Sequence, residues 1–206
     1  MKFKCIPVGE LEVNCYLLTE GSSAVIIDPG ASFDLLVKMV EEQNLSLKAI
    51  ILTHGHFDHV GAVAKLSEKF GAPVYAHKGD EEMLTDNEKS LATGFGCSVD
   101  PCKIDVYLED DSTVEIGGIK FDIYHTPGHS NGGVCLYTNG VLFTGDLLFK
   151  NSIGRFDRGD LRTELASLKR VMNTFDDETI VCAGHGESTT IGTERRYNPY
   201  IVNHIN

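Results

Sequence analysis

The stretch Thr53-His54-Gly55-His56-Phe57-Asp58-His59 places three histidines and an aspartate within six consecutive positions, 54–59. Imidazole and carboxylate groups are ligands that zinc, manganese and iron accept, and four of them this close along the chain can hold metal with little loop to order. A histidine-rich surface loop is the alternative interpretation. However, the apolar run Ala49-Ile50-Ile51-Leu52 leads directly into the stretch, which is typical of a buried strand that delivers a functional loop. The stretch therefore predicts a metal site at the end of a strand.

The spacing within the stretch predicts that more than one ion binds. His54 and His56 are two positions apart, which would place them on different faces of a helix, so they need an extended or looped backbone to hold one ion. Asp58 and His59 instead open a segment with helical apolar periodicity, which we expect to end at Gly71 because helices often end at a glycine. A second ion beside the first is the natural use for this second pair.

The composition of the 206 residues indicates a globular protein that is long enough for a hydrophobic core. The formal net charge of −12 argues against nucleic-acid and anionic-membrane partners, because phosphate groups are bound by clustered Lys and Arg. The sequence has no apolar run that could span a bilayer and no signal-peptide pattern, so we expect a cytoplasmic monomer or homodimer with a small-molecule substrate. The six cysteines form no Cys-x-x-Cys pair, and we expect free thiols.

Three further predicted strands lead into a residue that can bind metal. The strands over 119–124, 141–144 and 179–182 are followed by His129, Asp146 and His185. Taken alone, each of these histidines would be interpreted as an ordinary one, but the repeated pattern at strand ends favours one shared site. Glycines flank most of these residues and allow the backbone to approach a site closely.

The remaining elements are predicted from apolar periodicity and turn residues. One helix is expected after Ser32 and another after Asp160, since both residues can cap a helix N-terminus. The segment 86–103 has no clear period, and we expect either a loop near the site entrance or a plain surface insertion. Further strands are expected over 12–18, 24–27, 74–76, 113–116 and 134–137, and a short helix over 79–84.

Together, the run His54-x-His56-x-Asp58-His59 and the later His129, Asp146 and His185 resemble the metallo-β-lactamase-fold hydrolases along the whole chain. The resemblance implies an α/β (α+β) fold in a single domain over 1–206, a four-layer αββα sandwich of two mixed β-sheets flanked by helices, with the site at the edge of the sandwich. It implies seven metal ligands: His54, His56 and His129 for one ion, Asp58, His59 and His185 for the other, and Asp146 as the bridge. The expected cofactors are two divalent metal ions per chain, zinc first, with iron or manganese as the other choices.

Other motifs are similar to the short bacterial form of glyoxalase II: Pro7-Val8-Gly9 with Asn14-Cys15-Tyr16, the segment 152–155, and the C-terminal segment 184–199. This resemblance implies hydrolysis of a thioester, either S-2-hydroxyacylglutathione or a related acyl-thioester, with Arg155 at a basic substrate-binding position. The chain stops where longer glyoxalases carry a C-terminal helical glutathione-binding domain, and Asp157 stands where they have tyrosine. The resemblance therefore leaves the thiol carrier of the substrate open.

The mechanism that the resemblance implies uses a metal-bridging hydroxide, because metal coordination lowers the pKa of water from 15.7 to about 7. Asp58 would act catalytically as a ligand and as the hydrogen-bond acceptor that orients this hydroxide toward the thioester carbonyl. The leaving thiolate is the base of an acid with a pKa of about 8.5, so it needs little acid assistance.

Two alternative functions stay open. Persulfide dioxygenases resemble the chain at Gly154-Arg155-x-Asp157 and bind a single iron, here through His54, His129 and Asp146. A noncatalytic metal-binding protein is the other alternative. Two residue types narrow the field: aspartate rather than cysteine at position 146 disfavours a typical broad-spectrum β-lactamase, and histidine rather than glutamate at position 56 disfavours the flavodiiron oxygen reductases.

Overall fold

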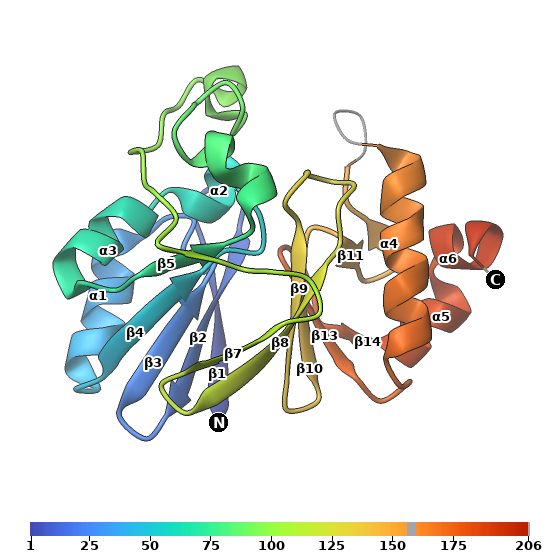
Figure 1. Cartoon of the computed structure of the whole chain (residues 1–206), viewed down its shortest axis with the longest axis horizontal. Coiled ribbons are helices and arrows are strands. Elements are labelled where there is room, and N and C mark those ends of the chain that lie inside the picture. Colours follow the sequence, from blue (N-terminus) through green and yellow to red (C-terminus); the bar gives the residue numbers. More distant parts are fainter. Residues whose placement is uncertain (156–159, 206) are drawn as a thin grey trace.

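The computed structural model describes residues 1–155 and 160–205, which form two six-stranded sheets with helices on their outer faces (Figure 1). The first sheet is mixed, because its first three strands pair antiparallel and the remaining strands continue in parallel. Its strands lie side by side in chain order: β1 (Lys2–Val8), β2 (Val13–Glu20), β3 (Ser23–Ile27), β4 (Ser46–Ile51), β5 (Val74–Ala76) and β6 (Val106–Tyr107).

The second sheet is also mixed, with one parallel pair, β10 with β13, among antiparallel neighbours. Its strands lie in the order β14 (Thr189–Thr190), β13 (Ile180–Ala183), β10 (Val141–Gly145), β9 (Val134–Thr138), β8 (Ile119–His125) and β7 (Thr113–Ile116). A separate antiparallel ribbon pairs β11 (Leu148–Phe149) with β12 (Ser152–Ile153).

The helices form the two outer layers, one on each side of the paired sheets (Figure 1). The first side carries α1 (Phe33–Glu42), α2 (Phe57–Val60) and α3 (Val63–Phe70), and the second carries α4 (Leu161–Thr174), α5 (Ile191–Tyr197) and α6 (Pro199–His204). Two 3₁₀ helices, η1 (Lys78–Leu84) and η2 (Ala92–Phe95), lie between β5 and β6 in the chain. The predicted four-layer αββα sandwich is therefore confirmed.

The alternation of side chains along the central strands explains the layering. Ala24 and Ile26 of β3 pack into the cluster shared with α1 and α3, whereas Val25 and Ile27 pack into the cluster between the two sheets. Successive residues of a strand point to opposite faces, so a strand that is covered on both sides is apolar at every position. Such strands are rigid, and they fix the positions of the loops that follow them.

Two sequence predictions about helices are corrected by the structure. The helix expected from Asp58 to Gly71 is interrupted between α2 and α3, where the Ala62 backbone N–H donates to the Pro29 oxygen at 2.9 Å. Gly61 lies close to Gly30 there, since an added Cβ would be 2.2 Å from the Gly30 carbonyl oxygen. The predicted end at Gly71 is confirmed by its φ of 63°. Ser32 precedes α1 as predicted, but its side chain makes no capping hydrogen bond because its φ of 59° is left-handed.

Among the described helices, none has the length and apolar character needed to cross a membrane.

Candidate metal centre

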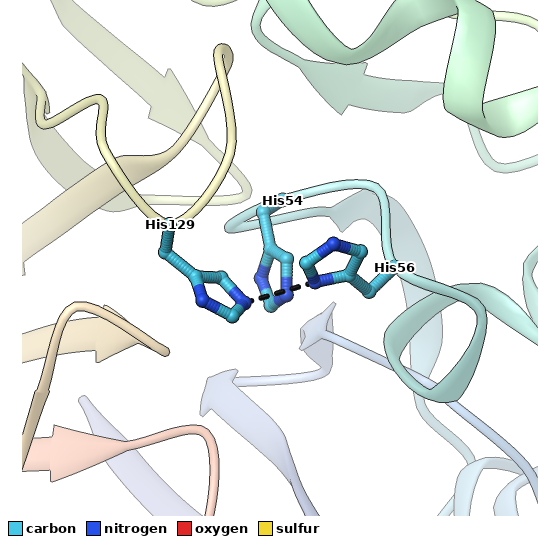
Figure 2. A group of neighbouring side chains, drawn as sticks. All are labelled: His54, His56 and His129. Carbon is cyan, nitrogen blue, oxygen red and sulfur yellow. Dashed lines mark hydrogen bonds between the residues drawn. The ribbon is translucent and has the colours of Figure 1, made fainter. Parts of the chain in front are cut away.

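Two loops at strand ends carry the first group of candidate ligands. His54 and His56 follow β4, and His129 lies in the loop between β8 and β9. One ring nitrogen from each residue lies within 4.8 Å of the others, and His56 Nδ1 and His129 Nε2 are 2.9 Å apart. Figure 2 shows the three rings turned toward one another. Three imidazole nitrogens that converge in this way can hold one divalent ion.

A second group of candidate ligands lies beside the first. Asp58 and His59 belong to α2, the short helix that directly follows the histidine loop, and His185 follows β13. One ligand atom from each of the three also lies within 4.8 Å of the others, with Asp58 Oδ2 at 3.3 Å from His185 Nε2. Asp58 and His59, the pair that the spacing assigned to a second ion, therefore lie together with His185, while His59 also lies near His54 of the first group.

Asp146 lies between the two groups. It follows β10, and its Oδ1 is 3.3 Å from His59 Nε2 in the second group. Its Oδ2 is 3.6 Å from His129 Nε2 in the first group and 3.6 Å from His185 Nε2 in the second. The carboxylate is thus within reach of both groups. The structure brings all seven predicted ligands together, and their role as ligands stays a prediction.

Hydrogen bonds on the outer side of two histidines direct Nε2 of both rings into the centre. His129 Nδ1 lies 2.9 Å from the backbone oxygen of Arg155, and His185 Nδ1 lies 3.0 Å from the backbone oxygen of Leu11. A carbonyl oxygen can only accept, so in both rings Nδ1 is the donor, and Nε2 is the nitrogen that a metal ion would bind in place of its present neighbours His56 and Asp58.

Three buried polar atoms at the centre have no hydrogen-bond partner among the described residues. They are His54 Nε2, His59 Nε2 and Asp146 Oδ1. Leaving a buried polar atom unsatisfied costs about 1 to 3 kcal/mol, so several of them at one point indicate a missing partner. Divalent metal ions satisfy imidazole and carboxylate ligands together, and the residues present therefore fit a metal.

Asp28 was not among the predicted site residues, but its carboxylate lies next to the centre and supports it. Its carboxylate accepts hydrogen bonds from the Thr53 backbone N–H at 2.8 Å and from Thr53 Oγ1 at 2.6 Å. It also accepts from His59 Nδ1 at 3.0 Å, which directs His59 Nε2 toward Asp146. A carboxylate that orients a metal-binding histidine is a common second layer of such sites.

Asp80, in η1, connects the two loops that carry the first group. Its carboxylate accepts from the backbone N–H of Gly55 at 3.0 Å, beside the first two histidines. It also accepts from Ser130 Oγ at 2.7 Å and from the backbone N–H of Gly132 at 2.6 Å, beside His129. Burial raises the pKa of Asp80, and these three hydrogen bonds act in the opposite direction. The carboxyl group therefore holds both loops in one arrangement.

The loop that presents His185 is fixed by strand β2. The Asn14 side chain donates to the backbone oxygens of Ala183 and Gly186 at 3.0 and 2.9 Å, and Tyr16 Oη donates to that of Ala183 at 2.7 Å. Gly184 allows the closest approach, since a Cβ there would lie 2.1 Å from Asp146 Oδ1. The expectation that glycines next to the ligands permit close contact is confirmed at this position.

Comparison with known proteins identifies the family. A model of the metallo-beta-lactamase superfamily matches residues 8–185. The chain belongs to this superfamily. Hydroxyacylglutathione hydrolase GloC of Haemophilus influenzae is 37% identical over 212 residues, which cover 98% of each chain. Two solved structures are also similar. The BLEG-1 B3 metallo-beta-lactamase is 38% identical with a TM-score of 0.92, and the match covers 97% of this chain and 99% of that one. TTHA1623 in a di-iron-bound form is 39% identical with a TM-score of 0.86, and the match covers 96% of this chain and 99% of that one.

In this superfamily member, two candidate ligand histidines have lowered pKa values and two have raised ones. Burial, followed by the other histidines, lowers the pKa of His54 well below its ordinary value and that of His56 to about 3. Burial also disfavours charge on His59, but Asp146 and Asp28 raise its pKa well above the ordinary value. Burial disfavours charge on His185, but its hydrogen bond to Asp58 raises the pKa above the ordinary value. Burial opposes charge on Asp146 too, yet His59 holds its pKa below the usual range. A metal ion binds neutral imidazole and ionised carboxylate, so it would replace the proton on His59.

Glu164 is a buried carboxyl group behind the centre that no sequence pattern indicated. Its side chain lies at the start of α4, is fully buried, and has no partner for either oxygen among the described residues. Burial, followed by repulsion from Asp146, raises its pKa to about 8. Its Oε1 lies against Gly154, where a Cβ would be 3.0 Å away from this oxygen and 1.9 Å from the Asp146 backbone oxygen.

A cavity of about 560 Å³ opens onto the centre. Of the candidate ligands, Asp58, His129, Asp146 and His185 line it, and the side chain of His185 is 29% exposed. Arg155 lines the same cavity, as the substrate-binding prediction requires, whereas Asp157 lies outside the described residues. The remaining lining residues are apolar or glycine: Leu11, Phe57, Leu91, Gly94, Phe95 and Phe149.

Three of these lining residues, Leu91, Gly94 and Phe95, come from the segment 86–103. The structure therefore favours the first of its two interpretations, a loop near the site entrance, over a plain surface insertion.

Proposed function

We propose that the protein is a dinuclear metal-dependent hydrolase that cleaves acyl-thioesters, with S-2-hydroxyacylglutathione or a related compound as substrate. One observation carries the dinuclear part of this proposal: the Asp146 carboxylate lies within 3.6 Å of ring nitrogens from both ligand groups. A single ion uses three to five ligands, so seven converging groups are more than one ion needs. The similarity to a hydroxyacylglutathione hydrolase supports the choice of a thioester substrate.

Each of the two groups would bind one metal ion. His54, His56 and His129 would hold one ion, Asp58, His59 and His185 the other, and Asp146 would contribute to both. When bound, the two ions would lower the pKa of water so that hydroxide is available at neutral pH. Zinc is our first choice, and iron is supported by the di-iron form of a relative with 39% identity; manganese accepts the same ligands.

Asp58 is the protein residue best placed to orient the nucleophile. It lines the cavity, its side chain is 14% exposed, and its Oδ2 is 3.3 Å from His185 Nε2. Its carboxylate can therefore accept a hydrogen bond from water on the cavity side while it binds metal on the other. Such an acceptor aligns the attacking oxygen with the thioester carbonyl and removes the need for a serine or cysteine nucleophile.

The cavity suggests how the substrate lies. Arg155 offers a guanidinium group, which pairs well with a carboxylate, and glutathione carries two such groups. In this strongly acidic protein, a local positive charge is needed to receive an anionic substrate. The aromatic side chains Phe57, Phe95 and Phe149 can cover the apolar parts of the thioester.

The persulfide dioxygenase alternative needs only one iron, held by His54, His129 and Asp146. In this alternative Asp58, His59 and His185, which lie close together, would bind no metal, and for this reason we place it second. A noncatalytic metal-binding role leaves the open cavity beside the ligands without a use.

One combined experiment tests the proposal. Metal content of the purified protein is measured by elemental analysis, and turnover is measured on S-lactoylglutathione, on glutathione persulfide with an oxygen electrode, and on a chromogenic cephalosporin. We expect two metals per chain and thioester hydrolysis. One iron per chain with oxygen consumption would establish the dioxygenase instead, and cephalosporin cleavage without thioester cleavage would establish a β-lactamase.

A further inference from the structure

A second cavity adjoins the one at the metal centre. It has a volume of about 380 Å³ and lies between the β1–β2 turn and the segment 97–99. The two cavities share four lining residues: Leu11, Phe57, Asp58 and Phe95. Because Asp58 is also a candidate metal ligand, a group that enters the second cavity starts beside the metal centre. A volume of this size lies within the range of small-molecule sites, and it exceeds what a two- or three-carbon acyl group needs.

The boundary between the two cavities is apolar and exposed. Leu11, at the β1–β2 turn, is 43% exposed, and Phe95, in η2, is 55% exposed. Phe95 packs on Phe57 with ring centroids 4.8 Å apart. Exposed apolar side chains that gather beside a pocket indicate a surface that a ligand covers. Burying their area against an apolar ligand would strengthen its binding.

The walls of the second cavity select a neutral apolar group. They include the apolar side chains of Val8, Val13, Ala31 and Val99. The charged residues that line this cavity in the described part of the chain are both acidic, Glu10 and Asp58. A carboxylate would be repelled here, whereas Arg155, which can bind one, lines the first cavity. A substrate with a charged end and a neutral end would therefore place its carboxylate in the first cavity and its neutral end in the second.

We propose that the acyl chain of the thioester extends over Leu11 and Phe95 into the second cavity, so that the protein prefers long neutral acyl groups over short ones. This inference rests on the proposed hydrolase, because it assigns the acyl end of that substrate. The thiol carrier, with its carboxylates, stays in the first cavity with Arg155.

The test compares binding and turnover in the metal-loaded protein. Binding of S-methylglutathione and S-decylglutathione, which cannot be hydrolysed, is measured by calorimetry. We expect the decyl compound to bind at least a hundredfold more tightly, because each fully buried methylene contributes a gain of about fourfold. Turnover is measured separately on lactoylglutathione and decanoylglutathione.

A variant that fills the second cavity tests whether the alkyl chain of the ligand lies there. Cys97 is exposed and lines the second cavity, so Cys97→Phe should fill that space and reduce the decyl-to-methyl binding ratio at least tenfold. Thr93→Phe is the matched control, since Thr93 is an exposed residue of the same segment that lines neither cavity in the described structure. The control should keep the wild-type ratio and the wild-type turnover.

The outcomes separate the two proposals. A decyl-to-methyl ratio near one, or an equal effect of Cys97→Phe and Thr93→Phe, overturns the acyl subsite even if lactoylglutathione is hydrolysed. A high ratio that Cys97→Phe abolishes, without hydrolysis of either thioester, supports the apolar subsite and shows that the hydrolase proposal is wrong.

Discussion

Asp28 Oδ2 accepts a hydrogen bond from His59 Nδ1 at 3.0 Å, although the two residues are 31 positions apart in the chain. The same oxygen accepts from Thr53 Oγ1 at 2.6 Å, and Thr53 Oγ1 lies 3.2 Å from His54 Nδ1. One buried carboxylate therefore orients a candidate ligand of each metal ion, directly for His59 and through a hydroxyl for His54. The two groups of candidate ligands share this support as well as the Asp146 carboxylate.

We predict that Asp28→Asn weakens metal binding about 10- to 100-fold, because the loss of a hydrogen-bonding partner behind a ligand has effects of this size. The site of His59 should lose metal first, since its contact with Asp28 is direct. Competition with a chromophoric chelator measures both affinities. Asp34→Asn makes the same change of charge at an exposed position in α1 and should bind metal normally. Equal metal affinities in the two variants would contradict the role of Asp28.

The sequence selected the candidate ligands by one local rule, a polar residue just after a buried strand, and the structure brings these residues together. Asp28 obeys the same rule, since it follows β3 directly, and the rule should have selected it. Asp80 could not be found in this way. It lies inside η1, and its partners Gly55 and Ser130 are 25 and 50 positions away, so no local pattern records their contact.

The sequence predicted most strands of the two sheets, including the exposed edge strand β7, but it missed β1 and the two-residue strands. Strand β1 is an edge strand whose first four residues, Lys2-Phe3-Lys4-Cys5, are exposed. Their alternation of polar and apolar residues is a strand signal that the sequence prediction did not use. The ribbon strands β11 and β12 have two residues each, which is too short for any period. At the interruption between α2 and α3 the backbone contacts residues 29 and 30, and helical periodicity does not contain such tertiary contacts.

We predict that Asp146→Ala lowers the occupancy of both metal sites, whereas His59→Ala lowers that of one. The difference follows from geometry: the Asp146 carboxylate lies within 3.6 Å of nitrogens in both groups, and His59 belongs to the second group. Elemental analysis of the purified variants gives the stoichiometry. If His59→Ala keeps the full metal content of the wild type, the dinuclear arrangement is wrong and His59 only supports a single site.

We predict that Arg155→Ala raises KM for glutathione thioesters roughly tenfold or more with little change in kcat. A hydrogen bond to a charged group contributes about 1.5 to 3 kcal/mol, and a contact made equally in the ground and transition states changes KM alone. The comparison substrate is a neutral thioester of similar size, on which the variant should match the wild type. An equal loss on both substrates would show that Arg155 acts through the structure of the loop, where its backbone oxygen accepts from His129.

The last prediction concerns Glu164, whose folded-state pKa is raised from an ordinary 4.5 to about 8 by burial and by Asp146. Below pH 4.5 both the folded and the unfolded chain carry the proton. Between pH 4.5 and 8 the unfolded chain has lost it while the folded chain keeps it, so Glu164 lowers the free energy of unfolding as the pH rises through this window. Above pH 8 the full cost of a buried carboxylate that has no partner among the described residues is present.

Glu164→Gln removes this cost because glutamine is neutral at every pH. We expect the variant to exceed the wild type in free energy of unfolding by about 1 to 3 kcal/mol at pH 8 and to lose most of that advantage at pH 5. Urea denaturation at the two pH values measures the difference. Glu115→Gln, an exposed change of equal charge in β7, should stay within about 0.5 kcal/mol of the wild type at both. A Glu164→Gln variant that is less stable than wild type at pH 8 would show that the ionised carboxylate has a stabilising partner.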